Sequence, residues 1–168
     1  MLPPQETLCA VEDFYGTNYS ITKLATTVPD TPYYYDFDNE LLIYEQQSDG
    51  TTNLVRQGGI MDEEKPSTHD KYAAFLVGNN GYSELSGHGE GSVLVIKDSY
   101  GNSLIPYLTQ SYAKIGILDL RAWNTSLITL DSLYEQGGYE RMLVLYNFPT
   151  FSADMFAYRM MDAANNAG

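Results

Sequence analysis

Three apolar runs in the second half of the chain alternate with segments of helical spacing. The runs cover residues 93–97, 115–120 and 142–147, and the segments that follow them predict helices over about 102–112, 126–136 and 152–164. Each connection is long enough for a crossover helix, which makes neighbouring strands parallel. The pattern predicts an α/β domain in which these three strands are parallel.

The first half of the chain has a different pattern. Apolar positions in 41–46 and 52–56 flank Ser48-Asp49-Gly50, and an Asp-Gly pair between two such runs is typical of a β-hairpin. We expect this hairpin to be an antiparallel excursion from the parallel sheet. Residues 71–77 fit either a short helix or a strand, and periodicity does not decide between them.

A polar residue follows each of the three predicted parallel strands. Ser99 follows the first, Arg121 the second, and Asn147 the third. Carboxyl ends of parallel strands meet at one edge of a sheet, where ligands bind and nucleophiles are presented. A hydroxyl, a guanidinium and a carboxamide at that edge are a candidate nucleophile with donors for an oxyanion.

Each of these residues also has a structural interpretation. Ser99 fits the N-terminal cap of a helix, and Asp98 fits a cap or a hydrogen-bond acceptor at the strand end. Arg121 fits an ion pair with Asp119, and Asn147 fits the support of a turn. The sequence leaves both interpretations open.

Composition narrows the class of protein. The chain has 168 residues, which favours one domain over residues 1–168. The net charge is −13, so the protein lacks the electrostatic attraction to phosphate that nucleic-acid binding needs, and we expect no DNA or RNA partner. No apolar run approaches the roughly 20 residues of a membrane span, and the first residues carry no export signal. The fifteen tyrosines suit either sheet faces or a sugar-binding cleft.

Residues that hold metals or cofactors are few. Cys9 is the single cysteine, so it has no partner for an internal disulfide, and we expect it to be inert. One cysteine and two histidines, His69 and His88, do not make the ligand pattern of a structural zinc site. The glycine-rich stretches 78–81 and 87–91 lack the lysine and serine of a phosphate-binding loop. We therefore expect no metal and no cofactor. Asn79, in the first stretch, fits loop structure or a residue facing the cleft.

Five blocks of the sequence together resemble the bacterial DHHW protein family. The blocks are DFYGTNYS at 13–20, DKYAAFLVGN at 70–79, VIKDSYGNS at 95–103, ILDLR at 117–121 and LYNFPTFS at 145–152. That family is similar to the SGNH/GDSL hydrolase superfamily and to acetyltransferase-like proteins that modify exported polysaccharides such as alginate. The resemblance implies a three-layer, flavodoxin-like parallel sheet.

The resemblance also implies roles for individual residues. Ser99 matches the nucleophilic serine, and Asn147 matches the asparagine of the oxyanion hole. Arg121 lies where the superfamily places another oxyanion donor, usually a glycine. The Asp-His-His-Trp motif that names the family is absent from this sequence. In the family this motif precedes the five blocks, so the chain is expected to correspond to the C-terminal portion of a family member. A serine hydroxyl is a poor nucleophile without a neighbouring base, so the missing Asp and His are the parts that the chemistry needs most. His69 and His88 are expected to be loop residues, although either is a formal candidate for the base.

Two functions follow from this comparison. The first is serine-dependent acyl transfer or ester hydrolysis, acting on O-acetyl groups of a cell-envelope or exported polysaccharide, in a protein completed by an N-terminal Asp-His segment. The second is a noncatalytic module of the same fold that binds a glycan or a protein. The resemblance implies an envelope or extracellular location for the complete protein.

Overall fold

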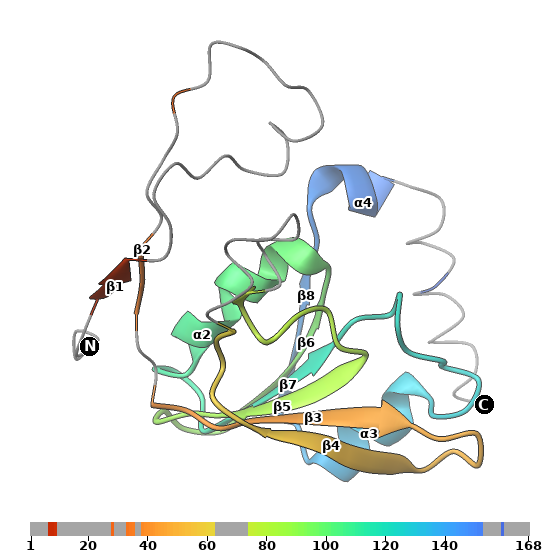
Figure 1. Ribbon diagram of the computed structural model, residues 1–168. Helices are drawn as coiled ribbons and strands as arrows, with labels where there is room; N and C mark the ends of the chain where they lie inside the picture. Colours follow the sequence, from red (N-terminus) through yellow and green to blue (C-terminus); the bar gives the residue numbers. More distant parts are fainter. Residues whose placement is uncertain are drawn as a thin grey trace.

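The fold is built around a six-stranded sheet with strand order β4-β3-β5-β7-β6-β8 (Figure 1). The computed structural model describes residues 7–9, 28, 33–35, 38–62, 74–152 and 159. The strands are β3 (Leu41–Gln46), β4 (Thr52–Gly58), β5 (Tyr82–Ser86), β6 (Ser92–Lys97), β7 (Lys114–Leu118) and β8 (Arg141–Leu145). A separate two-stranded antiparallel sheet joins β1 (Thr7–Cys9) and β2 (Tyr33–Tyr35).

The predicted parallel strands are confirmed. β6 pairs in parallel with β7 on one side and with β8 on the other. β6 is the central strand of the three and is buried along its whole length, as expected for a parallel strand that is covered on both faces.

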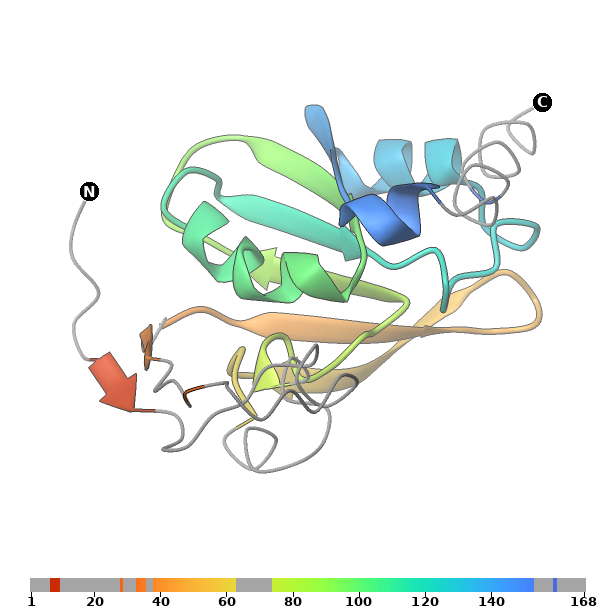
Figure 2. The same ribbon diagram turned by 90° about the horizontal axis from the view of Figure 1, so that it is seen from above.

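The chain reverses its direction across the sheet at β6. It passes from β6 to the neighbour β7, and then returns past β6 to reach β8 on the other side. Ile105 of the helix α2 (Ile105–Leu108) packs on one face, while Leu130 and Leu133 of α3 (Leu130–Gly137) pack on the other. Figure 2 shows the two helices on opposite sides of the strands. In α/β sheets such a reversal opens a crevice beyond the carboxyl ends of the strands.

The sheet as a whole is mixed, which corrects the expectation of a parallel sheet with a separate excursion. The predicted hairpin is present as β3 and β4, but β3 also pairs with β5, and β5 pairs antiparallel with β7. The hairpin therefore extends the main sheet.

Strand β5 was not predicted, because its sequence, YSELS, contains three polar residues. Glu84 is accommodated by hydrogen bonds, since its carboxylate accepts them from the Tyr82 hydroxyl at 2.7 Å and from Lys114 Nζ at 2.9 Å. Tyr139 adds a third donor at 3.3 Å. These partners, of which Lys114 and Tyr139 are distant in sequence, allow a charged residue in a central strand.

The helical segments are shorter than predicted. The segment expected over 102–112 is a 3-10 helix, η3 (Ser99–Ser103), followed by the single turn of α2. Pro106 lacks the N–H that would continue the helical hydrogen bonds from η3. α3 begins at Leu130 because Thr129 caps it, and it ends at Gly138, where φ is 64°. The last helix, α4 (Phe148–Ser152), starts before the predicted one, most of which lies outside the described residues.

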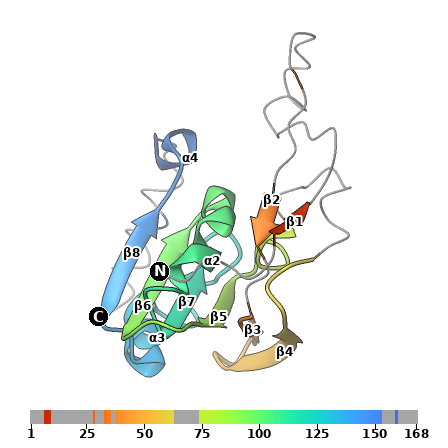
Figure 3. The same ribbon diagram turned by 90° about the vertical axis from the view of Figure 1, so that its left-hand side faces the viewer.

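Strand β8 forms an edge of the sheet, as Figure 3 shows. Its apolar side chains are exposed on both faces, with exposed fractions of 43% for Met142, 37% for Leu143 and 43% for Val144. An apolar edge strand of this kind is a template for pairing with another polypeptide segment.

Within the described residues, no helix is long and apolar enough to cross a membrane. The expectation of a single domain over residues 1–168, in three layers, also involves residues outside the described ranges. It stays a prediction.

The packing at Gly116 provides a test of this fold. A Cβ built on Gly116 would lie 2.2 Å from the Tyr139 hydroxyl, because that ring covers the centre of β7. We expect Gly116→Ala to lower the free energy of unfolding by about 1–3 kcal/mol in urea denaturation, the usual cost of overpacking. Gly59→Ala is the control, since nothing lies within 4 Å of its Cβ. Equal stability of the two variants would contradict the packing described here.

Candidate active site

Ser99 lies at the start of η3, directly after the central strand β6. The preceding residue, Asp98, is fully buried and caps η3, because its Oδ1 accepts a hydrogen bond from the Tyr100 N–H at 2.9 Å. Ser99 itself is half-buried. Among the described residues, none forms a hydrogen bond with the Ser99 hydroxyl, so the cap is Asp98 and the hydroxyl is available for other chemistry.

Asp98 also ties the end of β6 to the end of β8. Its Oδ2 accepts hydrogen bonds from the Asn147 N–H, at 3.0 Å, and from Asn147 Nδ2. The Asp98 N–H donates to the Leu145 carbonyl at 3.3 Å. This one carboxylate therefore holds the backbone at the ends of β6 and β8 together.

Asn147 lies at the predicted edge and also caps the next helix. Its Oδ1 accepts a hydrogen bond from the Thr150 N–H at 2.9 Å, and its Nδ2 donates to Thr150 Oγ1 at 2.8 Å. Both amide hydrogens are thus engaged, one by Asp98 and one by Thr150. The geometry agrees with the structural interpretation of this residue, and its role in an oxyanion hole stays a prediction.

A buried ionic cluster lies beneath the site, at the ends of β6 and β7. Asp119 Oδ2 is 2.5 Å from an Arg121 guanidinium nitrogen and 3.5 Å from Lys97 Nζ. Arg121 Nε adds a second hydrogen bond to Asp119 Oδ1 at 2.8 Å, so the pair is bidentate. Lys97 and Asp119 are almost completely buried, while 41% of the Arg121 side chain is exposed.

The two cations determine the protonation state of Asp119. Burial alone would raise the pKa of this carboxyl, but hydrogen bonds from Arg121 and the charge of Lys97 outweigh it and lower the pKa. Burial lowers the pKa of Lys97. The charge of Asp119, which lies farther from Lys97 than from Arg121, offsets this decrease only in part. The hydrogen bonds to Asp119 raise the pKa of Arg121. The site thus combines an ionised carboxylate with positive charge beside Ser99.

Asn79 belongs to this site, although the sequence did not separate it from ordinary loop residues. Its Oδ1 accepts hydrogen bonds from Lys97 Nζ at 3.4 Å and from Asn102 Nδ2 at 3.1 Å. The Gly-Asn-Asn-Gly stretch was the available signal, but it indicates a turn more often than a site.

The loop that carries Asn79 has a strained backbone. Leu76 and Val77 have φ values of 57° and 56°, a left-handed conformation that is rare for non-glycine residues and rarer for β-branched ones. Such strain costs on the order of 1–3 kcal/mol per residue and is concentrated at functional sites. Hydrogen bonds from the Leu76 N–H to the Ile60 carbonyl, and from Asn80 Nδ2 to the Leu76 carbonyl, hold the loop in place.

His88 is remote from Ser99. It precedes β6 while Ser99 follows it, and a six-residue strand is about 20 Å long. The His88 ring lies 3.4 Å from Asn39 Nδ2 instead. His69 lies outside the described residues. Within the described ranges, no group of three or more histidine, cysteine, aspartate or glutamate residues is placed to hold a metal ion.

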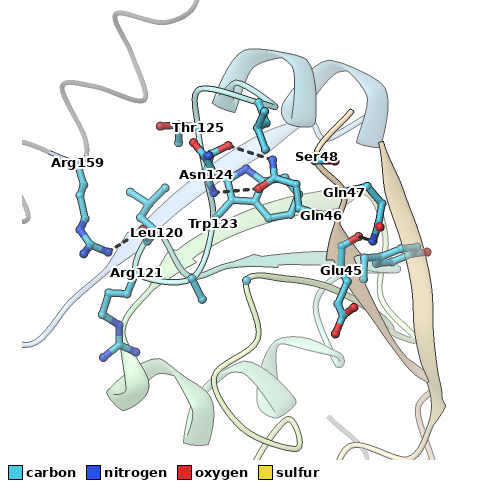
Figure 4. A pocket seen from close by; sticks show the side chains of 14 residues that line it. Glu45, Gln46, Gln47, Ser48, Leu120, Arg121, Trp123, Asn124, Thr125 and Arg159 are labelled. Carbon is cyan, nitrogen blue, oxygen red and sulfur yellow. Dashed lines mark hydrogen bonds between the residues drawn. The ribbon is translucent and has the colours of Figure 1, made fainter. Parts of the chain in front are cut away.

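A cavity of about 800 Å³ lies next to this site (Figure 4). Arg121 lines it, but Ser99 does not. The β3–β4 hairpin forms one wall and the segment after β7 forms the other, and the two are joined by the hydrogen bond from Gln46 Nε2 to the Asn124 carbonyl at 3.0 Å. Arg159 closes a third side by donating to the Leu120 carbonyl at 2.8 Å. The lining combines polar side chains with the aromatic residues Tyr44 and Trp123, a composition that is compatible with a polar ligand.

The fold and the site together define a mixed α/β protein with a serine at the carboxyl end of its central strand. The chain belongs to the DHHW protein family, whose model matches residues 6–118. The matched range includes Ser99 and Asn79 and ends before Arg121 and Asn147.

Solved structures have a similar fold. A DHHW family protein from Eubacterium siraeum superposes with a TM-score of 0.66 at 20% identity, over 84% of this chain and 47% of that protein. Bacillus cereus PatB1 with a sulfonyl adduct gives a TM-score of 0.60 at 20% identity, over 90% of this chain and 49% of PatB1. PatB1 alone gives 0.57 at 21% identity, over 76% of this chain and 43% of PatB1.

This chain therefore spans about half the length of the solved structures it matches. The comparison with curated proteins found no match.

Asp119 provides a test of the ionic cluster. We expect Asp119→Asn to lower the free energy of unfolding by about 3 kcal/mol at pH 7, because Lys97 would be left buried without its counter-ion. The pKa of Asp119 is lowered in the folded state, so its stabilising effect is complete above its unfolded pKa of about 3.9. That effect is lost as the pH falls through the folded pKa.

Urea denaturation from pH 7 to pH 2 measures both effects. Asp119→Asn should lose less stability than the parent when the pH is lowered from 7 to 2. Asp131→Asn, at the exposed first turn of α3, is the control and should change stability by less than about 1 kcal/mol. Equal losses for the two variants at pH 7 would show that the cluster does not stabilise the fold.

Proposed function

We propose that this chain is the serine-bearing part of an SGNH-hydrolase-like, three-layer acyl-transfer enzyme. In the complete protein, Ser99 transfers or hydrolyses O-acetyl groups of a cell-envelope or exported polysaccharide. The protein then works in the bacterial envelope or outside the cell.

The observation that carries the proposal is the position of Ser99. It follows the central parallel strand at the point where the chain reverses its direction across the sheet. Its hydroxyl has no hydrogen-bond partner among the described residues, while Asp98 performs the capping role that would otherwise explain a serine there. An available hydroxyl is what a nucleophile requires.

The proposed reaction has two steps. Ser99 Oγ attacks the acetyl carbonyl carbon while a base takes the hydroxyl proton, and the carbonyl electron pair moves onto oxygen to form an oxyanion. The intermediate then expels the sugar oxygen, which receives that proton, and leaves an acetyl-serine. Water or another sugar hydroxyl attacks the acetyl-serine and restores Ser99, so hydrolysis and transfer share the first step.

Positive charge near Ser99 favours this chemistry. Arg121 keeps a partly exposed guanidinium at the end of β7, and Lys97 lies beneath η3. Fixed cations stabilise an oxyanion more strongly in a buried site than in water. Arg121 is accordingly proposed to contact the intermediate, while its bond to Asp119 holds it in place.

Two further observations support the proposal. The family match includes Ser99. Among the structural relatives, Bacillus cereus PatB1 carries a sulfonyl adduct, and sulfonyl groups are electrophiles that nucleophilic side chains attack. The proposal extends this reactivity to Ser99.

The base is proposed to come from an additional segment. His88 is about 20 Å away, at the other end of β6, and the relatives are about twice as long as this chain. An Asp-His segment of the complete protein would then supply the base. The cavity next to Arg121 would hold part of the polysaccharide, since its amide and aromatic residues suit a sugar.

A second candidate is a noncatalytic module that binds a protein or a glycan. The exposed apolar residues of β8, together with Phe148 and Phe151 of α4, favour it, because large exposed apolar areas mark interaction surfaces. Saturable binding of an acetylated oligosaccharide without modification of Ser99 would support this candidate over the enzyme.

Covalent labelling tests the leading proposal directly. We expect a fluorophosphonate to modify the complete protein, which carries the proposed Asp-His segment, once and at Ser99, as mapped by mass spectrometry of tryptic peptides. Ser99→Ala should remove this labelling, with the thermal unfolding midpoint unchanged within about 2 °C, because the Ser99 hydroxyl forms no hydrogen bond with the described residues.

Ser103→Ala is the matched control, since Ser103 lies in the same 3-10 helix and its hydroxyl only donates to the Tyr100 carbonyl. It should be labelled at the parental rate. Labelling elsewhere than Ser99, or no labelling of the complete protein at millimolar reagent, would contradict the proposal.

A further inference from the structure

Two asparagines lie at the carboxyl edge of the sheet, and their amide groups are used in opposite ways. In Asn147 the oxygen accepts from the Thr150 N–H, so the nitrogen faces the Asp98 carboxylate and the Thr150 hydroxyl. A carboxylate only accepts hydrogen bonds, which fixes this orientation of the amide. Asn147 has no amide hydrogen left for a ligand.

In Asn79 the oxygen is the anchored atom. It accepts from Lys97 Nζ and from Asn102 Nδ2. An ammonium group only donates hydrogen bonds, so the atom that faces it must be the carbonyl oxygen. The Asn79 Nδ2 group then has no partner among the described residues, and the residue is exposed.

The anchors of Asn79 belong to the segment of the nucleophile. Lys97 lies two residues before Ser99, at the end of β6, and Asn102 lies three residues after it, in η3. Asn102 Nδ2 also approaches the Gly78 carbonyl at 3.4 Å, which holds the strained loop against η3. The loop that carries Asn79 is therefore fixed to the same short piece of backbone that presents Ser99.

We infer that Asn79, rather than Asn147, is the carboxamide that donates to the oxyanion formed at Ser99. This inference rests on the proposed acyl transfer and refines its site. The Asn79 Nδ2–H and the Ser99 backbone N–H donate to the carbonyl oxygen as it gains the electron pair, and no proton leaves Asn79. The Lys97 ammonium polarises the Asn79 amide through its oxygen, which strengthens the hydrogen bond that the nitrogen donates.

Asn147 has a different role in this account. It is a positioning residue that holds Asp98, and through Asp98 it holds the start of η3. Its removal should affect folding stability more than the rate of the chemical step.

The test compares rates of fluorophosphonate labelling at Ser99 in the complete protein, which carries the proposed base, because the phosphoryl oxygen of the reagent occupies the position of the oxyanion. In Asn79→Asp the carboxylate keeps both anchoring hydrogen bonds but offers no hydrogen. We expect a decrease of about 100-fold in the maximal inactivation rate of this variant, the usual effect of losing one oxyanion donor. Its half-saturating concentration and its thermal midpoint should remain those of the parent.

Asn79→Ala should show the same decrease in rate. Asn147→Ala should be labelled within about tenfold of the parental rate and should unfold at a lower temperature, because it loses the cap of α4. Parental labelling of Asn79→Asp, with the parent labelled at Ser99, would overturn the inference and leave the proposed function intact. A parent chain that is not labelled at Ser99 would overturn both.

Discussion

The buried carboxylate of Asp98 is the interaction on which the arrangement of the site depends. It accepts three N–H donors from two elements, one from Tyr100 and two from Asn147. One oxygen starts η3, and the other holds the end of β8 against the end of β6. Without these hydrogen bonds, neither the backbone of Ser99 nor the end of β8 would be fixed. Preorganisation of this kind is what a reacting group requires.

The ionic cluster adds charge to this fixed frame. Lys97 projects from the buried end of β6, where a lone ammonium would be strongly unfavourable. Asp119 provides its counter-charge and shares it with Arg121, and Asn79 provides a further acceptor. The buried lysine is therefore compensated by a carboxylate that follows β7 and by the loop that precedes β5. The hydrogen bond from Lys97 also links the strained loop to the strand that leads to the serine.

Much of the fold could be predicted from the sequence, because three apolar runs with helical connections specify parallel strands. Strand β5 could not be predicted, since Glu84 is stabilised by Lys114 and Tyr139, which are distant in sequence. The short helices after β6 also differ from the prediction, because periodicity does not report where a proline interrupts the hydrogen bonds.

The candidate site shows a similar limit. The strand ends of a parallel sheet brought Ser99, Arg121 and Asn147 to one edge, as the pattern indicated. An amide hydrogen is available for a ligand only if no neighbouring group already accepts it. The spacing of residues in the sequence does not show which groups become neighbours. The left-handed backbone of Leu76 and Val77, which precedes Asn79, has no signature in residue type. Asn79 therefore emerged from the geometry, while the sequence favoured Asn147.

Ser99 is proposed to be a nucleophile that faces an oxyanion donor. A crystal structure of the complete protein after reaction with a phosphonylating reagent is the decisive measurement. We expect an adduct on Ser99 Oγ with its free oxygen about 2.7–3.1 Å from Asn79 Nδ2, while Asn147 still donates to Asp98. An unmodified Ser99, or an adduct oxygen bound by Asn147 with Asn79 turned away, would show that this assignment is wrong.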